Sequence, residues 1–223
     1  MITSHHNPLL KDIRRIQRRP RGEGRFVAEG EDLVQAAAAA GWEPVVRLEA
    51  GVDVEADALD RVSALGSGSR VLAVYEERWA PAPSGPVCVA LWGVGDPGNV
   101  GTVLRGALAF GAASVALGPG CADPFGPKAV RASMGAVFAV PVARVTTVAE
   151  LPGPVIALAA REGEPLQGRP EGTLLVGAER TGLPPDVLAA GDAVAHIPIA
   201  SESLNAAMAA TVGLYEMSRF HAA

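Results

Sequence analysis

The amino-acid sequence predicts an α/β protein with a parallel sheet, preceded by a smaller α/β unit. Along residues 87–223, short apolar segments alternate with helical ones. The apolar segments lack the polar alternation of a half-exposed strand, so they indicate strands covered on both faces of a parallel sheet. The segment WAPAPSGP, residues 79–86, is rich in proline and also holds a glycine. It therefore predicts a linker between two domains.

The first domain is expected over residues 1–79, the linker over 80–86 and the second domain over 87–223. Runs of helix formers that end in a glycine predict helices that stop at Gly41 and Gly66. In the first domain we expect helices over 8–19, 31–40 and 55–65, and strands over 26–28, 44–48 and 70–75. In the second we expect helices over 99–110, 127–134 and 203–220, and strands over 87–92, 114–117, 137–142, 155–159, 173–176 and 193–197.

Composition and cysteine usage indicate a soluble cytoplasmic protein. Hydrophobic residues make up 49% of the 223 residues, which is enough for a sizeable core. No apolar run reaches the ~18–20 residues that cross a bilayer, and the N-terminus lacks the apolar stretch of a secretory signal. Cys88 and Cys121 form neither a disulfide framework nor a metal-ligand pattern. We therefore expect no metal site.

Basic side chains gather at the N-terminus of an otherwise acidic chain. The net charge is −5, but residues 1–25 carry seven basic side chains against two acidic ones, so this segment carries +5 and the remainder −10. The basic residues are Lys11, Arg14, Arg15, Arg18, Arg19, Arg21 and Arg25. Such a segment suits phosphate contacts with a nucleic acid. It equally suits a solvated, partly disordered tail, and charge leaves both interpretations open.

The stretch WGVGDPGNVGTVLRGALAFG, residues 92–111, contains a G-x-G-x-x-G pattern at 93–98. In a strand–turn–helix this pattern is typical of dinucleotide binding, as in an oxidoreductase. However, Pro97 lacks the N–H that would face a pyrophosphate, and no acidic residue ends a strand about 20 residues further on. The pattern also begins too late in the chain to leave room for a complete dinucleotide fold and a substrate domain. We therefore interpret the glycines as incidental.

Polar side chains follow three of the predicted strands. Asn99 lies in the turn after the first of them and is free to converge with Arg105, which stands out on the apolar helix that follows. Glu179 lies in a Gly-flanked turn after a later strand, and Ser203 and Asn205 follow the last one. Ser203 suits a helix N-cap. Because ligands bind at the carboxyl ends of parallel strands, we expect these side chains to lie at one edge of the sheet.

Together these segments resemble the SpoU (TrmH) family of RNA ribose 2′-O-methyltransferases, which belongs to the SPOUT group of S-adenosylmethionine-dependent enzymes. The matching blocks, in the family's order, are DPGNVG at 96–101 with Arg105 and AFG at 109–111, KAVRASMGA at 128–136, GAE at 177–179 with GL at 182–183, and IPI at 197–199 with SLN at 203–205. The N-terminal segments ITS, NP, LK and FVAEG are similar to the L30e-like substrate-binding domain of many members. The resemblance covers nearly the whole chain.

The resemblance implies a parallel sheet with a C-terminal trefoil knot and an N-terminal L30e-like domain that binds RNA. It also implies a homodimer with its sites close to the subunit interface. S-adenosylmethionine is the implied cofactor, held at Gly177, Ile197 and Leu204, and a side chain at Gly177 would crowd it. The implied activity is 2′-O-methylation of a ribose in structured RNA, 23S ribosomal RNA rather than transfer RNA, with no membrane partner.

The resemblance implies that the catalytic residues are Arg105, Asn99, Glu179, Ser203 and Asn205. The family assigns activation of the 2′-hydroxyl to Arg105. Because a guanidinium has a pKa above 12 and is a poor base, we expect Arg105 instead to bind the adjacent phosphate and stabilise charge on the 2′-oxygen. Asn99, Ser203 and Asn205 would hold the phosphate and ribose. Glu179 would orient Asn99 or Arg105.

The chain departs from the family pattern in its last two blocks. The spacer between Ile199 and Ser203 is shorter than the family's, two alanines at 206–207 replace a frequent Val-Ser pair, and Arg180 stands where a small residue is frequent. These departures keep an alternative open, namely an RNA-binding or ribosome-associated protein that retains the fold without catalysis. For Arg131, a structural role and an RNA contact are both open.

Overall fold

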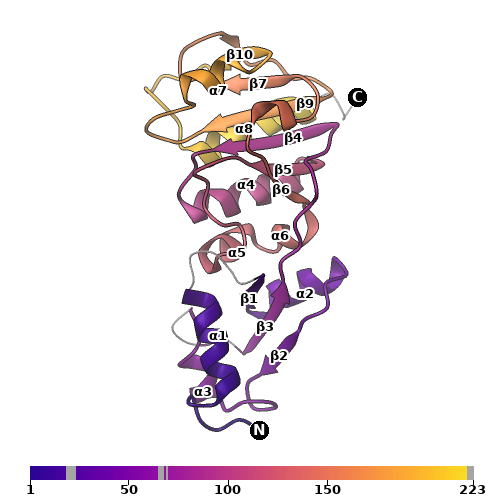
Figure 1. Cartoon of the computed structure of the whole chain (residues 1–223), viewed down its shortest axis with the longest axis vertical. Helices are drawn as coiled ribbons and strands as arrows, with labels where there is room; N and C mark the ends of the chain where they lie inside the picture. The colour runs from indigo at the N-terminus through magenta and orange to yellow at the C-terminus, as the bar shows by residue number, and fades with distance from the viewer. Residues whose placement is uncertain (19–23, 65–67, 69, 220–223) are drawn as a thin grey trace.

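The computed structural model of the chain describes residues 1–18, 24–64, 68 and 70–219. Figure 1 shows an elongated molecule with the N-terminal elements at one end and the C-terminal elements at the other. Within the described residues, the strands form a three-stranded sheet and a seven-stranded sheet. None of the described helices is long and apolar enough to cross a membrane. Arg19, Arg21, Gly66 and the expected end of the last helix at 220 lie outside the described residues.

The smaller sheet has the strand order β1-β3-β2 with antiparallel pairs. The elements of this part are α1 (Pro8–Arg18), β1 (Arg25–Glu29), α2 (Glu31–Ala39), β2 (Val46–Glu49), α3 (Ala56–Asp60) and β3 (Val71–Glu76). Ile13 and Ile16 of α1 share one core with Val27 and Leu72 of the strands. Their spacing places both isoleucines on one side of the helix, as the sequence predicts, and leaves the arginines of α1 on the other side.

The larger sheet is parallel in all its described strand pairs, as predicted. Its strand order is β6-β5-β4-β9-β7-β10-β8. The strands are β4 (Val87–Trp92), β5 (Ser114–Leu117), β6 (Val142–Arg144), β7 (Val155–Leu158), β8 (Glu164–Pro165), β9 (Gly172–Gly177) and β10 (Ala193–His196). β4 is buried along its whole length, which explains its unbroken apolar sequence. The trefoil knot stays a prediction.

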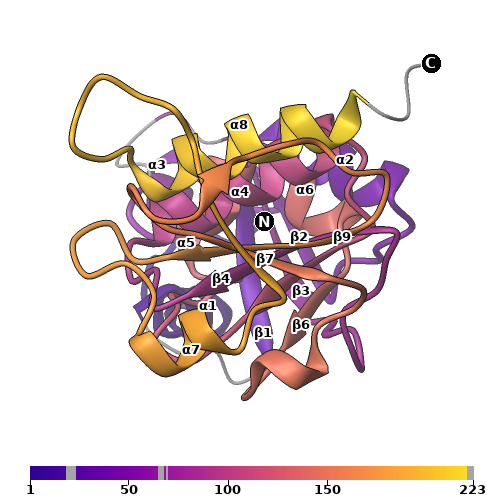
Figure 2. The same ribbon diagram turned by 90° about the horizontal axis from the view of Figure 1, so that it is seen from above.

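Helices cover both faces of the larger sheet. They are α4 (Pro97–Ala109), α5 (Pro127–Ser133), α6 (Ala136–Ala139), α7 (Pro185–Ala189), α8 (Ala206–Ser218) and the 3₁₀ helix η1 (Val148–Glu150). Figure 2 shows α4 and α8 on one face and α7 on the other. Alternate residues of β4 belong to the cores on these two opposite faces of the sheet. Val89 and Leu91 lie in the core beneath α4 and α8, whereas Cys88 and Ala90 share a core with Val187 of α7.

A buried aromatic cluster joins the two sheets. The ring of Phe26 on β1 lies 4.9 Å from that of Phe125 and 5.7 Å from that of Phe138 on α6, measured between centroids. Trp42 Nε1 donates a hydrogen bond to the carbonyl oxygen of Phe138 at 2.8 Å. The two parts of the chain therefore pack through a common core. Their division into domains at residues 80–86 stays a prediction.

The expected strand over 137–142 is wrong. Its first part forms α6, and β6 begins only where the expected strand ends. A short apolar run carries no periodicity that separates a buried helix from a buried strand. Gly135 separates α5 from α6 with a φ of 91°, and a side chain there would meet the Cβ of Ala36 at 2.5 Å. The contact with α2 is a tertiary feature that this local sequence does not reveal.

Several helix boundaries also differ from expectation. The helix expected over 55–65 ends at Asp60, and the last helix begins at Ala206 rather than at 203. The helix expected from Asn99 begins at Pro97 instead, because the side chain of Asp96 caps it and proline fits the first helical position. The short elements β8, η1 and α7 have no counterpart among the predicted elements.

Candidate functional site at the strand ends

The carboxyl ends of β4, β9 and β10 carry the turns in which we expect the polar side chains to meet. β4 leads through residues 93–96 into α4, β9 through 178–184 into α7, and β10 through 197–205 into α8. The strands are parallel, so these turns all leave the same edge of the sheet. The structure confirms this convergence, because a cavity is shared by the turns after β9 and β10, and hydrogen bonds link Asn99 at the start of α4 to both of them.

A cavity of about 460 Å³ lies among the turns that follow β7, β9 and β10. Gly177, Ile197 and Leu204, which the resemblance places at the cofactor, all line this cavity. Glu179 and Ser203 line it as well. The structure therefore brings five of the eight predicted site residues to one cavity, henceforth termed the strand-end cavity.

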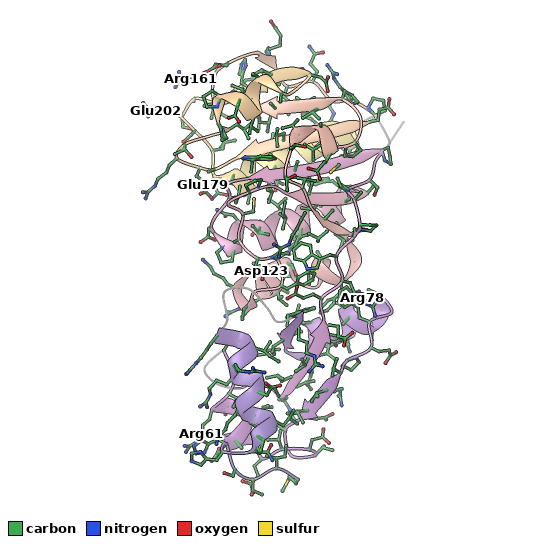
Figure 3. All side chains as sticks on the ribbon, in the orientation of Figure 1. Arg61, Arg78, Asp123, Arg161, Glu179 and Glu202 are labelled. Atoms are coloured by element: carbon green, nitrogen blue, oxygen red, sulfur yellow. The ribbon has the colours of Figure 1, made fainter. Side chains whose placement is uncertain are left out.

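Other residues line the strand-end cavity without having been predicted. Leu158 at the end of β7 and Leu183 and Leu188 beyond β9 add apolar surface, and Glu162 and Glu202 add carboxylates. Leu158 and Leu188 are apolar as ordinary core residues are, so the sequence offers no signal for them, whereas Leu183 belongs to the GL block at 182–183. Figure 3 shows the labelled Glu179 and Glu202 on the same side of the C-terminal part. In the described part of the chain, no group of His, Cys, Asp and Glu is placed to hold a metal ion.

Gly177 ends β9, and its own loop returns over it. A Cβ atom at this position would lie 2.4 Å from the carbonyl carbon of Gly182 and 2.5 Å from the nitrogen of Leu183. The N–H of Gly182 donates a hydrogen bond to the carbonyl oxygen of Ala178 at 2.8 Å, which closes the loop. The backbone of the loop therefore already excludes a side chain at Gly177. This reason differs from the expected crowding of a ligand.

A chain of hydrogen bonds links three of the predicted residues. Asn99 Nδ2 donates to Glu179 Oε1, and Asn205 Nδ2 donates to Asn99 Oδ1 at 3.2 Å. Asn205 Oδ1 accepts from two backbone N–H groups in the first turn of α8, at 2.9 and 3.3 Å. Asn205 is thus the N-cap of α8, a position expected for Ser203, which is exposed in the preceding loop. We term Asn99, Glu179 and Asn205 the polar cluster.

Asp96 caps α4 next to Asn99 of the polar cluster, and it is not among the predicted site residues. Its Oδ1 accepts the backbone N–H of Asn99 at 3.1 Å, and its Oδ2 pairs with Lys128 Nζ at 2.7 Å. The hydrogen bond from Lys128 lowers the pKa of Asp96. A pyrophosphate in a dinucleotide site would bind at this helix N-terminus, but the carboxylate of Asp96 already occupies it.

Arg105 lies away from the polar cluster within one chain. Asn99 is in the first turn of α4 rather than in the preceding turn, and six residues at 100° each place Arg105 about 120° around the helix from it. Arg105 is exposed and does not line the strand-end cavity. Its guanidinium forms no hydrogen bond or ion pair with any residue that the structure describes. The expected convergence of Asn99 and Arg105 therefore does not occur within a single chain.

Large apolar side chains are exposed where α4 and α8 pack together. The exposed residues are Leu108 (49%), Met208 (56%), Val212 (38%) and Tyr215 (50%), which we term the α4/α8 face. The ring of Tyr215 on α8 lies 6.1 Å from that of Phe110, the C-cap of α4, so these two rings pack where the helices meet. Arg105 precedes Leu108 by three positions and so shares its side of α4. Contiguous exposed apolar surface is typical of an interaction site.

Comparison with known proteins places this geometry in a family. The chain matches the SpoU rRNA Methylase family over residues 86–215. It is 31% identical over 246 residues to the 23S rRNA (guanosine(2553)-2′-O)-methyltransferase of Bacillus subtilis, an alignment that covers 97% of this chain and 98% of that protein. Its structure is similar to that of the AdoMet-bound rRNA methyltransferase from Sinorhizobium meliloti, with a TM-score of 0.88, 31% identity and coverage of 99% and 97%.

A second solved structure has the same arrangement. The SpoU methyltransferase AviRb from Streptomyces viridochromogenes, in complex with the cofactor AdoMet, matches with a TM-score of 0.85 and 25% identity, covering 98% of this chain and 99% of that one. These matches span both sheets, and the family match alone spans more than half of the sequence. The chain therefore belongs to the SpoU rRNA methylase family.

Proposed function

We propose that this chain transfers the methyl group of S-adenosylmethionine to the 2′-oxygen of a ribose in RNA. The observation that carries the proposal is the strand-end cavity with the polar cluster at its edge, since Glu179 belongs to both. Membership of the SpoU family and similarity to AdoMet-bound structures support the same activity. The cavity would hold the methyl donor, and the polar cluster would hold the ribose.

The strand-end cavity suits S-adenosylmethionine in size and chemistry. Its volume of about 460 Å³ lies within the range typical of small-molecule sites. Ile197 and Leu204 offer apolar surface to an adenine ring, and the carboxylates of Glu162 and Glu202 favour the positive charges of the sulfonium and amino groups. When bound, S-adenosylmethionine supplies an electrophilic methyl carbon. The loop closed at Gly177 forms one wall of this site.

The polar cluster would orient the attacking 2′-oxygen. Asn205 is held as an N-cap and in turn holds Asn99, while Glu179 holds the other side of Asn99. Both amides therefore have a fixed orientation before the substrate arrives, which is how positioning contributes to rate. Arg105 stays charged at any working pH. Its role would be to bind the neighbouring phosphate and stabilise negative charge that develops on the 2′-oxygen.

We infer that a second copy of the chain covers the α4/α8 face. Burying Leu108, Met208 and Tyr215 there would remove exposed apolar surface from water. In a two-fold pair each copy presents the same face to the other, and Arg105 lies beside that face. The homodimer would thus supply Arg105 from one subunit to the polar cluster of the other. This arrangement accounts for the separation of Arg105 and Asn99 within one chain.

We propose 23S ribosomal RNA, rather than transfer RNA, as the substrate. The Bacillus subtilis relative is named for 23S ribosomal RNA and aligns with nearly the whole chain, including the N-terminal part. Helix α1 presents Lys11 and Arg18 to solvent, while Arg15 pairs with Asp12 at 2.5 Å. These cations would contact RNA phosphates without regard to sequence.

The activity is tested by incubating the protein with methyl-labelled S-adenosylmethionine and total RNA, and by digesting the RNA to nucleosides. We expect label in a 2′-O-methylated nucleoside that comes from 23S ribosomal RNA. Label in transfer RNA would keep the chemistry and overturn the substrate preference. Absence of label, together with absence of donor binding by calorimetry, would overturn the enzymatic function and favour RNA binding without catalysis.

Two substitutions at Asn205 separate its capping role from its role in the polar cluster. Asn205→Asp keeps the N-cap acceptor, so we expect the free energy of unfolding to change by less than ~0.5 kcal/mol, whereas Asn205→Ala is expected to lose about 1 kcal/mol. Both variants lose the donor to Asn99, so we expect at least a tenfold fall in methyl transfer from each. Denaturant titration and initial rates measure the two effects. An Asp variant as active as the wild type would contradict the positioning role.

Replacing Arg14, Arg15, Arg18 and Arg19 by alanine is expected to weaken RNA binding and to reduce its salt dependence. Each phosphate contact that is lost lowers the slope of log K against log salt by about 0.7–0.9. Filter binding at a series of salt concentrations measures this slope. If the slope stays the same, these four arginines do not contact phosphate.

A further inference from the structure

A second cavity, of about 470 Å³, lies between the smaller sheet and α5. Its apolar wall includes Val27, Leu33 and Val130, and its polar rim includes Glu29, Lys128 and Arg131. We term it the β1/α5 cleft. Figure 1 shows α5 next to β1 and α1, where the two parts of the molecule meet. The proposed chemistry does not use this cleft, so its charged rim needs a separate account.

The β1/α5 cleft adjoins the polar cluster at the start of α4. Gly98 lines the cleft and directly precedes Asn99, so their Cα atoms are ~3.8 Å apart. A Cβ at Gly98 would meet the Cε of Lys128 at 3.2 Å, which shows that the lysine lies across the glycine. Lys128 in turn pairs with Asp96, the N-cap of α4, whose side chain accepts the backbone N–H of Asn99. A nucleotide next to a ribose held at Asn99 would therefore be within reach of the cleft.

The cations at the rim are available to a phosphate. Arg131 is exposed, and its guanidinium forms no hydrogen bond or ion pair with the residues that the structure describes. The side chain of Lys128 is 64% exposed, and its ammonium has donors beyond the one that Asp96 accepts. These two residues lie within one turn of α5, three positions apart, so they share one side of the helix. The rim thus presents two neighbouring cations beside an apolar wall.

The carboxylate of Glu29 keeps its negative charge at this rim, but hydrogen bonds fix its position, so a phosphate there would bind on the side of Lys128 and Arg131. Glu29 accepts hydrogen bonds from Gln17 Nε2, from Ser63 Oγ at 2.8 Å and from the backbone N–H of Ala64 at 2.8 Å. The contact with Gln17 also brings the end of α1 to the cleft. Arg18, the next residue and the last of α1, is exposed.

We propose that the β1/α5 cleft binds the base of a nucleotide next to the methylated one, with Lys128 and Arg131 contacting its phosphate. This inference rests on the proposed methyltransferase function. Proteins that recognise RNA loops take bases out of the stack into protein pockets, and phosphate contacts set the register of the strand. The apolar wall offers the surface for a base, and the volume lies within the range of small-ligand sites. The cleft would thereby select the RNA segment that enters the site.

Two substitutions test the cleft without changing the polar cluster or the strand-end cavity. Ala64→Trp starts from an exposed residue that lines the cleft and fills the space from its edge, and Arg131→Glu reverses one rim charge. Ala39→Trp, at an exposed position of α2, and Arg70→Glu, at the exposed residue just before β3, are matched controls in size and in charge. Each variant is compared with the wild type for its dissociation constant and KM towards in vitro transcripts of 23S and 16S ribosomal RNA and of transfer RNA. Calorimetry with S-adenosylmethionine and thermal unfolding are measured on the same samples.

We expect the two cleft variants to raise the dissociation constant and the KM for the preferred RNA at least tenfold, with donor affinity within twofold of the wild type. The controls are expected to stay within twofold throughout. Photocrosslinking of the wild type to transcripts containing 4-thiouridine is expected to label residues 27–33 or 127–132. The proposal is overturned if the cleft variants match their controls or if the crosslinks avoid both segments. Failure of the methyltransferase function would look different, because the wild type itself would then neither bind the donor nor methylate any transcript.

Discussion

Replacement of Arg105 by alanine is expected to lower methyl transfer to RNA by about 10²- to 10³-fold, the loss typical of removing one group that stabilises developing negative charge. Because Arg105 does not line the strand-end cavity, donor affinity measured by calorimetry should stay within twofold of the wild type. Arg105→Lys keeps the charge but not the planar fork of donors, so an intermediate rate is expected.

The matched control for this prediction is Arg169→Ala, which removes an exposed arginine from the loop before β9. It should retain wild-type rates. Sedimentation of both variants reports whether the dimer persists, since Arg105 lies beside the α4/α8 face. If Arg105→Ala methylates RNA as fast as Arg169→Ala, Arg105 has no part in the chemistry.

Gly177→Ala is expected to weaken binding of S-adenosylmethionine by at least ~10²-fold, which corresponds to about 2.7 kcal/mol. The added methyl group would lie 2.4 Å from the carbonyl carbon of Gly182, so the loop that forms one wall of the cavity must open. Calorimetry measures the donor affinity directly. The loss of methyl transfer should follow the loss of donor binding.

Gly95→Ala is the control for the glycine substitution. A Cβ there meets no atom nearer than 3.9 Å, and Gly95 does not line the strand-end cavity. Its donor affinity should therefore equal that of the wild type. Unchanged donor binding by a folded Gly177→Ala protein would show that the loop does not form the donor site. Thermal unfolding of both variants distinguishes local opening from general destabilisation.

The two variants together test whether Arg105 acts across the dimer. In a heterodimer of Arg105→Ala and Gly177→Ala subunits, one site would combine an intact cavity with an intact arginine from the partner subunit. Purified heterodimers should then regain about half of the wild-type activity, since one site of two is complete. If Arg105 acted within its own chain, both sites would be defective and the heterodimer would stay inactive.

The hydrophobic pattern was sufficient to predict most of the larger sheet. The strands expected over 87–92 and 114–117 coincide with β4 and β5, because strands that are buried on both faces appear as unbroken apolar runs. The same pattern failed over 137–142, where an equally apolar run forms α6. Local hydrophobicity indicates burial, and the tertiary contacts of this segment, such as that of Gly135 with α2, are not visible in it.

The motifs also predicted which turns would meet, because parallel strands deliver their turns to one edge. The resemblance implied that Glu179 would orient Asn99 or Arg105, but it left open which of the two, and it implied no bond between Asn205 and Asn99. The hydrogen bonds of Asn99 to Glu179 and to Asn205 span 80 and 106 positions of the sequence. The capping role of Asn205 and the support from Asp96 and Lys128 likewise depend on where helices begin and pack, which no motif states.

Residue types and their order were thus sufficient to predict the family, the parallel sheet and the polar groups of the site. These features depend on local chemistry and on a repeated burial pattern. Only the folded structure showed that Arg105 lies away from Asn99, and that the backbone of the following loop leaves no room for a side chain at Gly177. The same holds for the cleft between β1 and α5, whose two walls lie about a hundred residues apart in the sequence. Such features arise from contacts between distant segments, and the free energy of those contacts depends on the whole packing arrangement rather than on any one stretch of sequence.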